Sequence, residues 1–81
     1  MNIIALNLPR DLTNEGLSEM FSAYGEVSSA QLVMDKERGT SKGFGFVEMP
    51  DSGEAQTAIT ALHGKKVGGN KIRVKVSTKT I

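Results

Sequence analysis

The chain has 81 residues, of which 38% are hydrophobic and 23% charged, and a net charge of +1, as expected for one small soluble domain. It contains no cysteine, which excludes disulfides and thiolate metal sites and makes a reducing cytoplasm the expected location. No apolar run reaches the roughly 18 residues of a membrane span and the N-terminus lacks the basic start of a secretory signal, so no membrane association is expected.

The first half of the chain predicts a strand, a helix and a second strand. Residues 2–9 (NIIALNLP) are apolar on both alternating faces, as in a central strand, and the run ends in proline. Residues 12–25 place apolar side chains at helical spacing, with Thr13 as a candidate N-cap and Gly25 at the expected end. A strand at about residues 27–34 follows. Its expected faces are Ala30, Leu32 and Met34 on one side, and Gln31 and Val33 on the other.

The second half of the chain repeats this order. After the charged loop DKERGTS, residues 42–49 (KGFGFVEM) alternate as a strand. Asp51 and Glu54 form a candidate capping box for a helix that ends near Gly64. A VGGN turn then leads to the alternating stretch KIRVKV. Its expected faces are Ile72, Val74 and Val76 inward, and Lys71, Arg73 and Lys75 outward.

The resulting order, β-α-β-β-α-β, predicts an α+β fold of the ferredoxin-like type. Each half is a strand, a helix and a strand, which favours right-handed crossovers with both helices on one face of a four-stranded antiparallel sheet. The other face of the sheet is then bare.

The third strand has one charged side and one side without charge. Lys42 and Glu48 would be costly beneath a helix, so their side of the strand, which also carries Phe44 and Phe46, is expected to face water. The alternative is that the two phenylalanines enter the core and the charged residues lie at frayed strand ends. If the phenylalanines face water, the opposite side of the strand faces the helices, where glycine permits the helix and strand backbones to approach closely. The residues expected there are Gly43, Gly45, Val47 and Met49.

Residues 42–49 resemble a known motif. KGFGFVEM is similar to the RNP octamer of the RNA recognition motif, Lys/Arg-Gly-Phe/Tyr-Gly/Ala-Phe-Val-x-Phe/Tyr, at seven of its eight positions, and Met49 departs from it. Residues 3–8 (IIALNL) lie where the family has its RNP hexamer. The resemblance covers nearly the whole chain. On this basis residues 1–79 are expected to form a single RNA recognition motif domain, similar to the family's small one-domain bacterial members.

The resemblance implies the strand order 4-1-3-2 and binding of single-stranded RNA, or single-stranded DNA, on the exposed sheet face. In that arrangement Phe46 stacks on a base, Phe44 lies against sugars or a neighbouring base, and Lys42 contacts a phosphate. Ile4 stands where the family usually has an aromatic residue, and Leu6 where it often has glycine, so weaker binding is expected. The other residues expected to contact RNA are Asn2, Gln31, Glu48, Arg73, Lys75 and Ser77.

Charge is distributed unevenly along the chain. All nine acidic residues lie before residue 65, whereas six of the ten basic residues follow. Those six are Lys65, Lys66, Lys71, Arg73, Lys75 and Lys79. Such segregation can form a basic stripe for a polyanion, or it can mark an edge strand that its lysines protect from aggregation.

A protein-interaction or homodimerisation module is the alternative function. Five apolar residues on the exposed parity can form a contiguous patch, and such patches often mark protein interfaces. They are Ile4, Leu6, Val33, Phe44 and Phe46. With single-stranded RNA as the leading partner, we expect a monomer.

No catalytic residue, cofactor or metal is expected. An acylphosphatase-like enzyme on the same scaffold needs a glycine-rich anion loop with an arginine after the first strand, whereas here Arg10 is followed at once by Asp11. A heavy-metal-binding domain needs a Cys-x-x-Cys pair. His63, the only histidine, precedes a predicted helix-ending glycine and is interpreted as a polar end residue.

Overall fold

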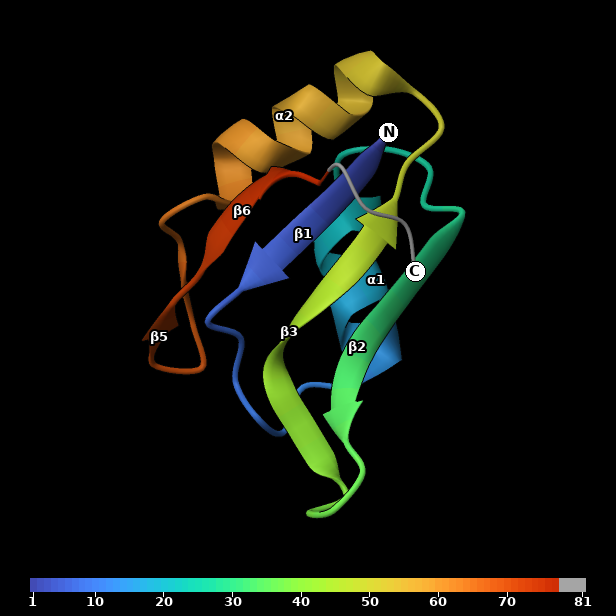
Figure 1. Ribbon diagram of the computed structural model, residues 1–81. Helices are drawn as coiled ribbons and strands as arrows, with labels where there is room; N and C mark the ends of the chain where they lie inside the picture. The colour runs from blue at the N-terminus through green and yellow to red at the C-terminus, as the bar shows by residue number, and fades with distance from the viewer. Residues whose placement is uncertain (78–81) are drawn as a thin grey trace.

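A computed structural model describes residues 1–77 (Figure 1). Lys79 and the predicted end of the domain at residue 79 lie outside these residues. No helix in residues 1–77 is long and apolar enough to cross a membrane. The elements are β1 (Asn2–Leu6), α1 (Asn14–Ser22), β2 (Ser29–Asp35), β3 (Thr40–Glu48), α2 (Ser52–Leu62), β4 (Lys66–Val67), β5 (Asn70–Lys71) and β6 (Arg73–Val76).

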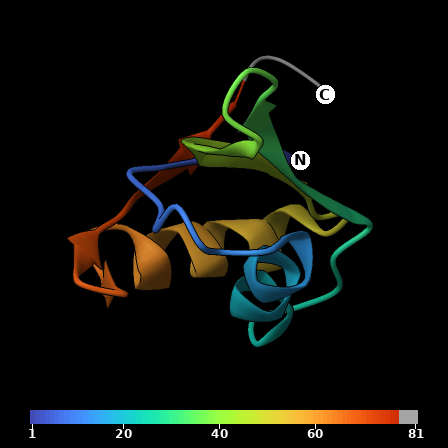
Figure 2. The same ribbon diagram turned by 90° about the horizontal axis from the view of Figure 1, so that it is seen from below.

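Four strands form one antiparallel sheet in the order β2-β3-β1-β6. This is the predicted order 4-1-3-2 read from the opposite edge, with β6 as the fourth strand. Both helices pack against one face, and no described element covers the other (Figure 2). The ferredoxin-like α+β class is therefore confirmed. The largest side chains of the core between sheet and helices are Phe21, Ile3, Leu8, Leu17, Met49, Leu62, Ile72, Val47 and Val74.

Both helices begin at the predicted residues, whose side chains accept a backbone hydrogen bond. The Thr13 hydroxyl accepts from the Gly16 N–H at 3.0 Å, and the Asp51 carboxylate accepts from the Glu54 N–H at 3.0 Å. The predicted capping box is only half formed, because the Glu54 carboxylate accepts from the Glu26 N–H at 3.2 Å instead. That bond ties the start of α2 to the loop before β2.

β1 and α1 end earlier than predicted. β1 stops at Leu6, before Pro9 is reached, because Asn7 adopts a left-handed conformation with φ of 58° that turns the chain out of the sheet. α1 ends at Ser22 rather than near Gly25. A hydrogen bond from the Tyr24 N–H to the Phe21 carbonyl, at 3.0 Å, closes its last turn.

Two residues on the helix-facing side of the sheet are more exposed than the sequence predicts. The register of β2 against β3 shifts between Leu32 and Met34, and Met34 is 50% exposed although alternation placed it in the core. Val76, also predicted to point inward, is 47% exposed at the end of β6. β4 and β5 form a separate hairpin, in which Gly68 and Gly69 have φ of 56° and 86°, as a type I′ turn requires.

The helix-facing side of β3 carries two glycines, so little side-chain volume separates the strand from its neighbours. Gly43, Gly45, Val47 and Met49 are all buried, as predicted. An added Cβ at Gly45 would lie 2.6 Å from the Gln31 carbonyl oxygen and 3.0 Å from the side chain of a leucine on α1. Glycine at this position therefore allows β2 and α1 to approach β3 closely.

Replacing Gly45 with alanine is expected to lower the free energy of unfolding by roughly 2 to 3 kcal/mol, because the methyl group collides with backbone that cannot move aside. Chemical denaturation measures the loss. Gly39→Ala is the control, since its methyl group meets no atom within 4 Å. Its φ of +68° still costs about 1 kcal/mol for a residue with a side chain. Equal losses from the two variants would contradict the collision.

Candidate nucleic-acid interface

The strand register arranges most of the predicted contact residues in three rows across the uncovered sheet face. The middle row is Gln31, Phe46, Ile4 and Lys75, from β2, β3, β1 and β6. The row toward the end of β1 is Phe44, Leu6 and Arg73. The row at the start of β1 is Glu48 and Asn2. These nine residues together with Lys42 are called the platform below.

Phe44 and Phe46 lie at the centre of the platform. Both side chains are partly exposed, while their neighbours Gly45 and Val47 are buried. The ring centroids are 6.3 Å apart and the ring planes meet at 80°, an edge-to-face contact. The predicted orientation of the third strand is therefore correct, and the alternative in which the phenylalanines enter the core is wrong.

Ile4 and Leu6 extend the apolar centre onto β1. Ile4 is opposite Phe46 and Leu6 is opposite Phe44, and both are half-buried. An aliphatic side chain beside each ring widens the apolar surface but offers no second flat face on which a base could stack. Val33, which the predicted apolar patch also includes, is half-buried opposite the bulge in β3 and has no direct cross-strand partner there.

Charged residues lie around this apolar centre. On β6, Arg73 and Lys75 are exposed and pair with Leu6 and Ile4 across the strands. Lys42 is exposed near the start of β3, whereas Glu48 ends the strand and its carboxylate accepts from the Ser28 hydroxyl at 2.9 Å. The platform is therefore basic along β6 and at one end of β3, and acidic at the other end.

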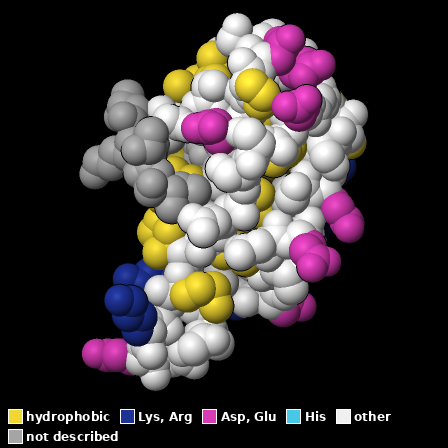
Figure 3. Space-filling model, turned by 90° about the vertical axis from the view of Figure 1, so that its right-hand side faces the viewer, with side chains coloured by type: hydrophobic (Ala, Val, Ile, Leu, Met, Phe, Trp, Pro, Cys, Tyr) yellow, Lys and Arg dark blue, Asp and Glu magenta, His cyan; other side chains and the backbone are white. Residues whose placement is uncertain are grey.

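The view from the β2 side shows a further basic cluster, with one acidic side chain beside it (Figure 3). Lys and Arg side chains gather at the lower end of the molecule, near the loop between β2 and β3, and acidic side chains lie mostly along the top and the helix side. Ser77, predicted to lie in the fourth strand, follows β6 instead, and its N–H donates to the Asn2 carbonyl at 2.8 Å.

A hollow of about 370 Å³ lies where β1 ends against β3, and sequence reasoning missed it. Arg10, considered in the sequence only for an enzymatic anion loop, lines this hollow together with Lys42. We call it the end hollow. The hollow is hard to predict from the sequence, because Asn7 and Asn70 line it from a loop and a hairpin, and strand alternation does not predict where such residues lie. The full lining is Leu6, Asn7, Leu8, Arg10, Lys42, Gly43, Phe44 and Asn70.

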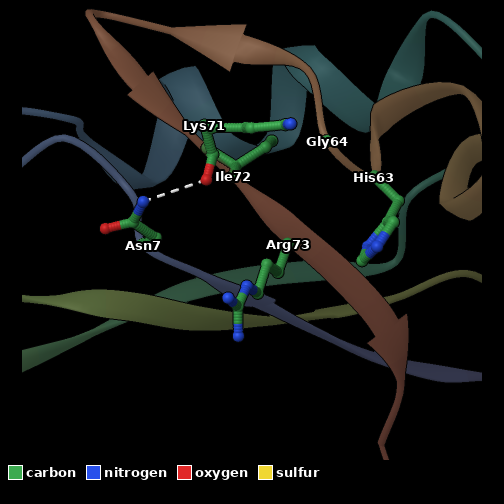
Figure 4. A pocket seen from close by; sticks show the side chains of 6 residues that line it. All are labelled: Asn7, His63, Gly64, Lys71, Ile72 and Arg73. Carbon is green, nitrogen blue, oxygen red and sulfur yellow. Dashed lines mark hydrogen bonds between the residues drawn. The ribbon is translucent and has the colours of Figure 1, made fainter.

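A second hollow lies on the outer side of β6, beside the end of α2 (Figure 4). Asn7, His63, Gly64, Lys71, Ile72 and Arg73 line it. His63 Nδ1 lies 3.1 Å from both the backbone nitrogen and the carbonyl oxygen of Val74. The Gly64 N–H donates to the Ile72 carbonyl at 2.8 Å, and the Ile72 N–H donates to the Lys65 carbonyl at 3.0 Å. His63 therefore contacts the strand edge, in keeping with its interpretation as a polar residue at a helix end.

The family model and the similar proteins found by comparison agree on one family. The family model described as RNA recognition motif matches residues 5–73. The chain is 43% identical over 74 residues to the putative RNA-binding protein RbpB of Nostoc, covering 91% of this chain and 72% of that protein. It is 45% identical over 71 residues to the chloroplastic 28 kDa ribonucleoprotein of Spinacia oleracea, covering 88% of this chain and 30% of that protein. The chain thus spans less than a third of the spinach protein.

Solved structures give the same result. The crystal structure of RNA-binding protein PG1 matches with a TM-score of 0.94 and 40% identity, over 100% of this chain and 98% of that one. A Sex-lethal protein–RNA complex matches with a TM-score of 0.90 and 29% identity, over 98% of this chain and 47% of that one.

Phe46→Ala is expected to cost about 1 kcal/mol of stability, since the half-exposed ring loses mainly its edge-to-face contact. Val47→Ala, one residue further along the strand, should cost roughly 2 to 3 kcal/mol because it opens a cavity in the core. Urea denaturation of both variants measures the difference. A Phe46 variant less stable than the Val47 variant would mean that the ring is a core residue.

Proposed function

The chain belongs to the RNA recognition motif family, and on that premise we propose that it binds single-stranded RNA on the platform without catalysing a reaction. The observation that carries the proposal is the pair of partly exposed rings, Phe44 and Phe46, at the centre of a sheet face that no described element covers. The names of the relatives in Nostoc and spinach, and the Sex-lethal complex with RNA, support the same class of ligand.

Stacking supplies the apolar part of the binding. With 80° between the ring planes, a base that lies flat on one ring meets the edge of the other. The two rings therefore have different roles: Phe46 stacks on a base, and Phe44 lies against sugars or the next base. Each stacked base contributes about 1–3 kcal/mol, with little dependence on its identity.

Phosphate contacts supply the electrostatic part. Lys42, Arg73 and Lys75 are exposed along two sides of the rings, within reach of a backbone that runs across the platform. Three such contacts give a log–log dependence of affinity on salt with a slope of about −2. Neither stacking nor these phosphate contacts require the 2′-hydroxyl, which supports single-stranded DNA as a second ligand of the same surface.

Ile4 limits the affinity. It pairs with Phe46 in the middle row, where the family usually presents an aromatic residue. Two rings at about 1–3 kcal/mol each and a few phosphate contacts hardly reach the roughly 8 kcal/mol of a micromolar complex after ordering costs. A monomer therefore binds RNA with micromolar affinity or more weakly.

The second candidate is a protein-binding or self-associating platform. The observation that favours it is the aliphatic pair Ile4 and Leu6 beside the two rings, which enlarges the exposed apolar surface. In that case the platform buries against another protein surface, and Arg73 and Lys75 form part of a polar rim.

Titration with single-stranded RNA tests the function directly. We expect measurable binding at low salt, little binding to duplex RNA, and a loss of about 1–3 kcal/mol of binding free energy in Phe46→Ala. The matched control is Val47→Ala, which lowers stability but should bind normally below its melting temperature. Absence of binding to any single strand at low salt, or nanomolar affinity from the isolated monomer, would refute the proposal as stated.

Ile4→Tyr separates the two candidates. If RNA is the ligand, the added ring should tighten binding by about 1 kcal/mol, the lower end for one stacked base. Ile4→Val is the control, since it keeps an aliphatic side chain. A tyrosine variant with unchanged RNA binding and altered self-association, measured by sedimentation, would favour the protein-binding platform.

A further inference from the structure

We propose that the end hollow takes one further nucleotide of the strand bound on the platform. Its phosphate meets Arg10, beside the Lys42 that the platform already uses, and its base edge meets Asn7 and Asn70. The inference rests on the proposed single-strand binding and extends it beyond the sheet face, to a loop and a hairpin.

Arg10 is positioned by the protein. Its Nη1 donates to the Ser41 carbonyl at 3.4 Å, and its Nε would lie 3.0 Å from a Cβ placed on Gly43. Gly43, with φ of 88°, therefore leaves the space in which the arginine lies against β3. A guanidinium has five N–H donors, so one bond to Ser41 leaves others for a ligand.

The two cations of the end hollow are not neutralised by the protein. Within residues 1–77, neither Arg10 nor Lys42 forms an ion pair with a carboxylate. Both line the same hollow. Two exposed cations with a guanidinium held in place favour an anionic ligand such as a phosphodiester.

Asn7 is fixed at the rim of the hollow with its acceptor available. Its Nδ2 donates to the Lys71 carbonyl at 2.9 Å, which ties the end of β1 to β5 (Figure 4). The close-up shows the Oδ1 atom on the side away from that bond. An oriented amide oxygen accepts from an amino or imino N–H of a base. Asn70, half-buried at the start of β5, adds a second amide to the lining.

The remaining wall of the hollow suits a nucleotide better than a bare anion. Phe44 and Leu6 line it as well, and both belong to the platform. The hollow thus combines an aromatic ring, an aliphatic side chain, two amides and two cations. Because Phe44 is shared, a strand leaving the platform at this end enters the hollow without a gap.

The test compares the binding of an eight-nucleotide single-stranded RNA by Arg10→Ala, Asn70→Ala and the native chain. Arg10→Ala should weaken binding about fivefold and make the salt slope shallower by about 0.7, the effect of one lost phosphate contact. Asn70→Ala should weaken binding without changing the slope. Lys65→Ala, which removes the same charge outside the hollow, should stay within about twofold of the native chain.

Two further arms keep the outcomes apart. A three-nucleotide RNA fills the platform alone, so the effect of Arg10→Ala should largely disappear with it. Adenosine monophosphate tests for a separate ligand, with the side-chain amide resonances of Asn7 and Asn70 as the readout. If the monophosphate moves these resonances and the eight-nucleotide RNA does not, the hollow takes a free nucleotide and the inference is overturned.

Failure of the inference differs from failure of the proposed function. If Phe46→Ala weakens RNA binding while Arg10→Ala and Asn70→Ala bind as the native chain does, the platform stands and the end hollow is not a nucleotide site. If Phe46→Ala also leaves binding unchanged, both proposals fail. Thermal melts establish that each variant is folded, and Arg10→Lys, which keeps the charge, should retain the native salt slope.

Discussion

Two helices can cover only one face of a four-stranded sheet, and the division of each strand into a buried and an exposed side follows from this constraint. Each strand must bury one side and expose the other. In β3 the buried side holds Gly45 and Val47, and the exposed side holds Phe44 and Phe46. Large rings therefore occupy the side that usually carries polar residues. That inversion is unfavourable for a free surface, and it becomes useful when the ligand itself is flat and apolar on both faces.

Glycine in β3 connects the packing of the core to the shape of the exposed face. Gly45 brings β2 and α1 close to the strand, which fixes the backbone that carries the two rings. Gly43, in a left-handed conformation, bends the strand where its pairing with β2 shifts register. Its carbonyl accepts from the Leu8 N–H at 2.7 Å, and its missing side chain leaves room for Arg10. The end hollow thus lies at the same irregularity that interrupts regular pairing between β2 and β3.

The sequence predicted the parts of the fold that depend on local pattern. Alternation and helical spacing identified the elements, and the cost of burying Lys42 assigned the faces of β3 correctly. What it missed depends on contacts between distant segments. Met34 is exposed just past the register shift between β2 and β3, although it stays on the face of Leu32, and the left-handed turn at Asn7 is not visible in a continuous apolar run. Arg10 was not assigned to the nucleic-acid surface, because only tertiary structure brings it to Lys42.

The basic residues of β6 have two possible roles, protection of the sheet edge and attraction of a polyanion, and the contacts of that edge distinguish them. Charged residues on an outer strand commonly prevent edge-to-edge aggregation. Here the outer backbone is already engaged at Val74, in the middle of β6, by the His63 ring, and at Ile72, just before β6, by the loop after α2. Arg73 and Lys75 are therefore not required to protect that stretch of the edge. Their side chains instead flank the rows that contain the two rings, where cations attract a polyanion. This arrangement favours the polyanion interpretation over edge protection.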